Sequence, residues 1–105
     1  MSQTNLAAAP AVLVEDDVEF TLDELCRICR ADEAQLRALI YEGVLTPSGE
    51  DPQQWRFAGT VLRRTRVALR LTRDLQLSAD AAALVLDLLD EIEVLKSRLR
   101  RAADH

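Results

Sequence analysis

Two helix-capping signals a short distance apart constrain this chain more than any other feature. Thr21 is followed three residues later by Glu24, and Asp32 is followed three residues later by Gln35. In each pair the first side chain can accept from a backbone N–H of the first helical turn, and the second can reach back to the cap. Gly43 predicts the end of the second helix, because glycine adopts the left-handed conformation without steric cost. Two short helices with so tight a connection are a candidate helix-turn-helix.

The composition favours a mainly α fold. The chain has 105 residues, which suits one domain, and only 4% of them are aromatic although 49% are hydrophobic. A core with so few rings must be built from Leu, Val, Ile and Ala, which favours packed helices over a sandwich of many strands. We expect a flexible tail at residues 1–10 and a single domain at residues 11–105. Residues 11–57 form the helix-turn-helix and wing, and residues 58–105 form an amphipathic helix and a long C-terminal helix.

Short β-prone segments flank the two helices. Ala11–Phe20 is interrupted by acids and predicts at most one or two small strands. Thr46–Gln54 contains turn-forming Pro, Gly and Asp residues and predicts a loop. Trp55–Phe57 is a short extended segment, and the Val12–Val14 run could pair with it as a small β wing.

An amphipathic helix is expected from about Ala58 to Leu75. Its apolar side is formed by Val61, Ala68, Leu69, Leu71 and Leu75. Four arginines, at spacings of three, four and three, form a basic stripe on the other side: Arg63, Arg66, Arg70 and Arg73. A solvated helix face is the commonest role of such a stripe, although it could also bind phosphates or an acidic protein surface.

The last helix carries a heptad pattern. Ser78 is a plausible N-cap, and apolar residues then recur at alternating spacings of four and three: Ala81, Val85, Leu88, Ile92, Leu95, Leu99 and Ala102. The first half is apolar beyond this seam, at Leu84, Leu86 and Leu89, so we expect it to pack on the domain as well. The regular seam, without another long helix to pair with, predicts a homodimer in which Val85, Leu88, Ile92, Leu95 and Leu99 meet a second copy.

An acidic band follows the same helix. Asp80, Asp87, Asp90 and Glu91 share one side of it. Such a band is usually only a solvated surface. It is also a natural docking site for a basic helix, because opposite potentials steer encounter and fix register.

No constellation in the sequence indicates catalysis, a cofactor or a metal. Cys26 and Cys29 have C-x-x-C spacing, but they lie late in a capped helix rather than at a helix start, and the only histidine is His105. We interpret the two cysteines as small buried thiols, and we expect the protein not to be an enzyme. The first residues lack a basic signal-peptide region, and no apolar stretch reaches about 18 residues, so we expect a cytoplasmic protein without a membrane span.

The charge distribution disfavours DNA. Lys and Arg number 13 against 18 Asp and Glu, for a net charge of −5, and non-specific DNA affinity comes from neutralising phosphates. On the second helix of the motif, which would read DNA, Asp32, Glu33 and Glu42 oppose a lone Arg37. The architecture is therefore that of a DNA-binding motif with a surface that phosphates would repel.

The first half resembles the MerR-type winged helix. The resemblance rests on Phe20–Leu25, Leu36 with Arg37, Glu42–Pro47, and Arg56 with Phe57. It implies a MerR-like winged helix-turn-helix with a small β wing and a long C-terminal dimerisation helix.

The second half resembles the chaperone modulator family CbpM. Trp55–Phe57, the arginine-rich helix, Asp74–Leu77 and Leu86–Ile92 before Leu95 carry this resemblance, which covers roughly residues 18–101. It implies a protein that binds the J-domain of the DnaJ-like co-chaperone CbpA and blocks both its stimulation of DnaK and its association with DNA.

The residues leave several alternatives beside this family function. The acidic band on the last helix is our expected J-domain contact, and the acidic surface at Asp32 and Glu33 is the alternative. A MerR-like transcriptional regulator, with the arginine stripe and Arg56 on phosphates, is the second candidate function. A small adaptor dimer with an unknown partner is the third.

Overall fold

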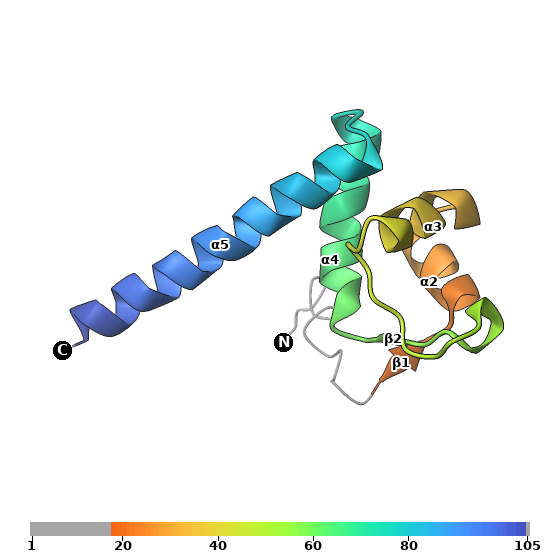
Figure 1. Ribbon diagram of the computed structural model, residues 1–105, viewed down its shortest axis with the longest axis horizontal. Helices are drawn as coiled ribbons and strands as arrows, with labels where there is room; N and C mark the ends of the chain where they lie inside the picture. The colour runs from red at the N-terminus through yellow and green to blue at the C-terminus, as the bar shows by residue number, and fades with distance from the viewer. Residues whose placement is uncertain (1–17, 105) are drawn as a thin grey trace, which may run out of the picture.

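The computed structural model describes residues 18–104, and helices predominate in it (Figure 1). The elements in chain order are β1 (Glu19–Phe20), α2 (Leu22–Cys29), α3 (Glu33–Tyr41), η1 (Pro52–Gln54), β2 (Phe57–Ala58), α4 (Val61–Leu69), the π-helical turn η2 (Arg70–Asp74) and α5 (Ala79–Ala103). This arrangement confirms the mainly α architecture. The predicted tail at residues 1–10 lies outside the described residues.

Both predicted capping boxes are present. At the start of α2, the Thr21 hydroxyl accepts from the Glu24 amide at 3.1 Å, and the Glu24 carboxylate accepts from the Thr21 amide at 2.8 Å. At the start of α3, Asp32 and Gln35 make the same reciprocal pair, with both bonds at 3.0 Å. The two helix starts are therefore fixed by local sequence, as expected.

Gly43 ends the second helix as predicted. It lies at φ +78°, directly after the cap residue of α3. Its amide donates to the Ile40 carbonyl at 3.0 Å, and the next amide, of Val44, donates to the Leu39 carbonyl at 2.9 Å. This bond pair is a Schellman motif. It turns the buried Val44 back onto the core beside Leu39.

The first strand of the small sheet, β1, lies at the end of the predicted β-prone segment Ala11–Phe20. β1 pairs with β2 in antiparallel register, with Phe20 opposite Phe57. The Val12–Val14 run lies outside the described residues, so its pairing stays a prediction. Phe57 is fully buried, and its ring anchors the sheet to the helices.

The helix expected from Ala58 to Leu75 is shorter and irregular. Ala58 belongs to β2, so α4 begins only at Val61, and after Leu69 the chain continues as the π-helical turn η2. The wider turn changes the helical register, and Leu75 is 64% exposed rather than on the apolar side. The prediction that Leu75 continues the apolar side of the helix was therefore wrong.

The hydrophobic core joins all the helices. Its fully or nearly fully buried members are Leu22, Leu25, Cys29, Leu36, Leu39, Val44, Leu45, Phe57, Leu62, Ala68, Leu69 and Leu86. The loop residues Val44 and Leu45 belong to it because the α3 cap directs them inward.

Helix α5 packs on the domain only at its start and then extends away from it (Figure 1). Ser78 caps it as predicted. Ala82 and Leu86 are its buried residues, whereas Leu84 is 61% and Leu89 42% exposed. The expected packing of the first half of α5 on the domain is confirmed at Leu86, whereas Leu84 and Leu89 lie largely outside the core because only a narrow side of the first turns meets it.

Candidate interaction surfaces

The predicted seam forms an exposed apolar stripe along α5. Val85 is half-buried, and the other four seam residues have exposed fractions between 45% and 70%: Leu88, Ile92, Leu95 and Leu99. Contiguous apolar exposure of this kind is typical of interaction surfaces. Within residues 18–104 no other element covers this stripe.

Asp80 acts as part of the α5 cap. Its carboxylate accepts from the Ser78 hydroxyl and, at 3.0 Å, from the Ala81 amide. These bonds, the Ser78 hydroxyl first, lower the pKa of Asp80. The side chain is therefore engaged with the helix end, where a negative charge also suits the helix dipole.

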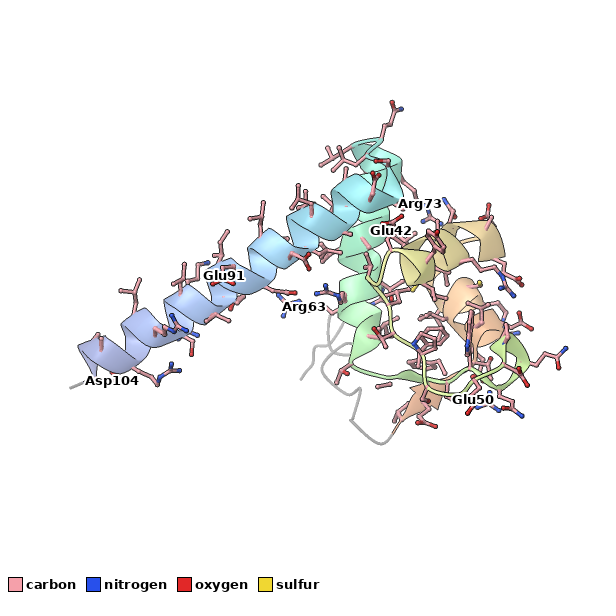
Figure 2. The ribbon with its side chains drawn as sticks, viewed as in Figure 1. Glu42, Glu50, Arg63, Arg73, Glu91 and Asp104 are labelled. Atoms are coloured by element: carbon pink, nitrogen blue, oxygen red, sulfur yellow. The ribbon has the colours of Figure 1, made fainter. Side chains whose placement is uncertain are left out.

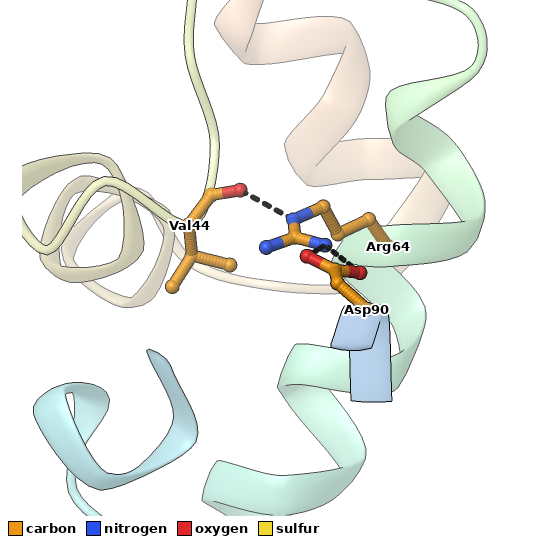
Figure 3. A network of polar contacts seen from close by, with 3 residues as sticks. All are labelled: Val44, Arg64 and Asp90. Atoms are coloured by element: carbon orange, nitrogen blue, oxygen red, sulfur yellow. Dashed lines mark hydrogen bonds and ion pairs between the residues drawn. The ribbon is translucent and has the colours of Figure 1, made fainter. Parts of the chain in front are cut away.

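Asp90 joins α5 to the rest of the fold. Both of its carboxylate oxygens accept from the Arg64 guanidinium at 3.1 Å, and Arg64 also donates through Nε to the Val44 carbonyl at 2.9 Å (Figure 3). One arginine thus links the end of the α3 cap, α4 and α5. The sequence pattern missed Arg64. Arg64 lies three residues after Val61 and four before Ala68, so its place on the apolar side of α4 could have indicated a structural role.

Asp87 and Glu91 are the two carboxylates of the band that remain unengaged. Both are exposed, and within the described residues neither has a basic side chain within 4.0 Å. Figure 2 shows Glu91 midway along α5, beyond the part that packs on the domain. The four residues predicted as a band thus divide into one cap, one structural ion pair and two free charges.

Helix α3 presents no unpaired basic side chain. Arg37, the single basic residue of α3, pairs with Glu33 at 2.6 Å, and its guanidinium lies 5.5 Å from the centre of the Trp55 ring. The acids Asp32 and Glu42 at the two ends of α3 are exposed. A phosphate approaching this helix would meet carboxylates and an arginine that is already paired.

The four arginines of the predicted stripe are exposed, as expected for a solvated or binding face. Arg63 points toward the gap between α4 and α5, and Arg73 lies at the far end of α4 toward α3 (Figure 2). The stripe therefore faces two different parts of the surface rather than one.

The two cysteines are free thiols. Burial is the main cause that raises the pKa of both Cys26 and Cys29 above the ordinary value, so both favour the neutral form. No group of three or more potential metal ligands occurs among residues 18–104. The same part of the chain holds no helix that is both long and apolar enough to cross a membrane.

Comparison with known proteins identifies the family. Residues 20–102 match the MerR HTH family regulatory protein model. The chain is 30% identical over 89 residues to the chaperone modulatory protein CbpM of Coxiella burnetii (strain Dugway 5J108-111), covering 85% of this chain and 84% of that protein. It is also 30% identical over 80 residues to CbpM of Pseudomonas putida (strain GB-1), covering 76% of this chain and 79% of the relative. The chain belongs to the CbpM family.

Membership in the CbpM family confirms the resemblance read from the sequence, and the MerR match confirms the helix-turn-helix fold. The names of the family and its relatives describe regulators and chaperone modulators, which are non-catalytic kinds of protein. This CbpM family member is accordingly a chaperone modulator built on a MerR-type scaffold.

Proposed function

We propose that this protein inhibits a CbpA-like co-chaperone by binding its J-domain in competition with DnaK, without catalysing a reaction. The similarity to CbpM relatives over 85% of the chain carries the proposal. A cytoplasmic location follows from such a partnership, and two free thiols suit a reducing compartment.

The charge of the surface supports this partner. J-domains engage their DnaK partner through a basic helical face, so a competitor needs an exposed acidic one. We infer that Asp80, Asp87, Asp90 and Glu91 contribute with unequal weight. Asp87 and Glu91 are free to face a cation, whereas Asp90 is neutralised by Arg64 and Asp80 is engaged at the helix cap.

We further propose that the active form is a homodimer through the apolar stripe of α5. Helix α5 is acidic in its first half, from Asp80 to Glu93, and basic in its last turns, from Lys96 to Arg101. Antiparallel pairing places halves of opposite sign side by side, whereas parallel pairing places like charges together. The charge polarity therefore favours the antiparallel arrangement.

The second candidate function is DNA binding by a MerR-like regulator, which the match to that family favours. The phosphate contacts would come from Arg56 and from the four arginines of the predicted stripe, all of which are exposed. The paired Arg37 and the acids at the ends of α3 weigh against it. Duplex DNA shifted in a gel at low salt, with affinity falling steeply as salt rises, would support this alternative.

Two assays test the main proposal together. Titration of the purified J-domain of the co-chaperone from the same organism into this protein should give saturable binding. Addition of the protein to DnaK and the full-length co-chaperone should suppress the stimulated ATPase rate and leave the basal rate of DnaK unchanged. Saturable binding without suppression would refute competition, and the absence of binding would refute the partner.

A further inference from the structure

A hollow on the side of the molecule away from the outer half of α5 carries a separate inference. It lies where the end of α2 meets the end of α4, and its volume is about 310 Å³. Its lining residues are Cys29, Arg66, Leu69, Arg70, Arg73 and Asp74. Three guanidinium groups and one carboxylate thus surround a floor made by a thiol and a leucine side chain.

The positive charge of this hollow is unpaired within the described residues. Arg66, Arg70 and Arg73 have no carboxylate within 4.0 Å, whereas Arg37 and Arg64 do. These three side chains also line one hollow together, whereas the protein as a whole carries a net charge of −5. Such a group can accept an anionic partner without first breaking an internal ion pair.

Arg73 is also held in place. Its Nη2 donates to the Arg30 carbonyl and, at 3.1 Å, to Oε1 of Gln35. Arg30 is in the left-handed conformation at φ 54°, which is unfavourable for a residue other than glycine. Arg73 belongs to the π-helical turn η2. Strained backbone and π-helical turns both concentrate at functional sites, and here they meet at one point.

We propose that this hollow binds an acidic segment of a partner protein that also carries an apolar side chain. Arg66 and Arg73 are seven residues apart, which is about 10 Å along a helix. That span exceeds a single phosphate group and matches carboxylates one or two helical turns apart. Between these arginines, Leu69 and Cys29 form an apolar floor that can receive an apolar side chain of the partner. A nucleic-acid backbone has no such side chain.

Neighbouring carboxylates favour a protein over a nucleic acid. Asp74 lies on the rim of the hollow, and Asp32 and Glu33 are exposed at the start of α3. A continuous line of phosphates would run into these acids, whereas a short acidic segment can end before them. This surface is separate from the acidic residues of α5, which are the proposed main contact with the J-domain.

A fluorescent helical peptide tests the inference. The probe is an alanine-based peptide of about 15 residues, with Glu at positions i, i+4 and i+7 and one Leu between them, and a Gln version is the control. Binding to the full chain is followed by fluorescence anisotropy at low ionic strength. We expect saturable binding of the Glu peptide, which charge reversal at Arg66→Glu with Arg70→Glu weakens at least about tenfold.

A charge-matched pair of substitutions distinguishes binding in the hollow from attraction by the overall charge of the protein. Arg63→Glu with Arg98→Glu changes the net charge equally at exposed positions outside the hollow and should weaken binding by no more than about twofold. In a Cys26→Ser background, the bound Glu peptide should also slow alkylation of Cys29, which lies on the floor of the hollow.

Three results overturn the proposal. The first is equal weakening by the matched pair, and the second is the absence of any peptide binding that depends on Arg66 and Arg70. The third is binding of a duplex DNA probe that depends on these arginines and that the Glu peptide fails to compete with. Circular dichroism confirms that each variant remains folded, as expected for substitutions at exposed side chains.

Discussion

Removal of the Arg64 side-chain charge should destabilise the fold more than removal of its carboxylate partner. Arg64 makes two contacts of unequal burial: a hydrogen bond to the Val44 carbonyl, and an ion pair with Asp90. The Arg64 side chain is 30% exposed and that of Asp90 is 59% exposed. Solvent therefore screens the ion pair, which contributes about 0.5 kcal/mol.

The hydrogen bond to the Val44 carbonyl contributes more. It is charge-assisted and partly buried, and a bond of that kind is worth about 1.5 to 3 kcal/mol. The variant Arg64→Met keeps an unbranched stem of similar length and loses both contacts, so the expected loss is about 2 to 3.5 kcal/mol. Asp90→Asn loses only the ion pair and should cost about 0.5 kcal/mol.

Urea unfolding followed by circular dichroism measures the difference. With a slope of about 1.5 kcal/mol/M for a domain of this size, Arg64→Met should lower the midpoint by about 1.3 to 2.3 M. Arg63→Met is the matched control, because Arg63 is exposed and should shift the midpoint by less than about 0.3 M. If Asp90→Asn destabilises as much as Arg64→Met, the reasoning from burial is refuted.

The further predictions concern the α2 cap, the glycines Gly43 and Gly49, and the α5 stripe. The hydrogen bond from the Thr21 amide lowers the pKa of Glu24. The Glu24 carboxylate therefore stabilises the fold above the unfolded-state pKa of about 4.3, and this stabilisation disappears as the pH falls through the folded-state pKa. The urea midpoint of Glu24→Ala should accordingly depend less on pH below about 4.3 than the midpoint of the parent protein. Gly49→Ala should cost more than about 2 kcal/mol in the same assay, since Gly49 lies at φ +98° and a Cβ there would be 2.7 Å from the Gln54 carbonyl oxygen. Gly43→Ala should cost only about 1 kcal/mol, because nothing lies within 4 Å of its Cβ position, and equal costs would contradict this comparison. Ile92→Asp should halve the mass measured by sedimentation while leaving the monomer folded, since Ile92 is 45% exposed in the single chain; an unchanged mass would refute the dimer stripe.

Local signals predicted the helix-turn-helix well. The capping boxes at Thr21 and Asp32 and the glycine at Gly43 each act within a few residues, so each can be read from the sequence directly. The same holds for Ser78 at the start of α5. The capping box and Gly43 thus fix the start and the end of α3, where the sequence placed the acidic residues Asp32 and Glu42.

Features that depend on distant contacts were not predictable. The pairing of β1 with β2 converts Ala58 from a helical to a strand residue, and the π-helical turn takes Leu75 out of the apolar side. Periodicity assumes a regular helix, so it cannot report either event. For the same reason the acidic band looked uniform in sequence, although packing of α5 against α4 engages Asp90 with Arg64 and leaves Asp87 free.

The central claim is that free carboxylates on α5 attract a basic J-domain. Stopped-flow association of the J-domain with Asp87→Lys combined with Glu91→Lys tests it most directly, with Glu93→Lys combined with Asp104→Lys as the matched charge change elsewhere on α5. We predict that the first pair slows association about tenfold or more and weakens its salt dependence, and that the control pair changes the rate by about twofold or less. Association that is equally fast in the parent and the Asp87 and Glu91 variant would contradict the account, and slowing by Asp32→Lys with Glu33→Lys instead would move the docking surface to α3.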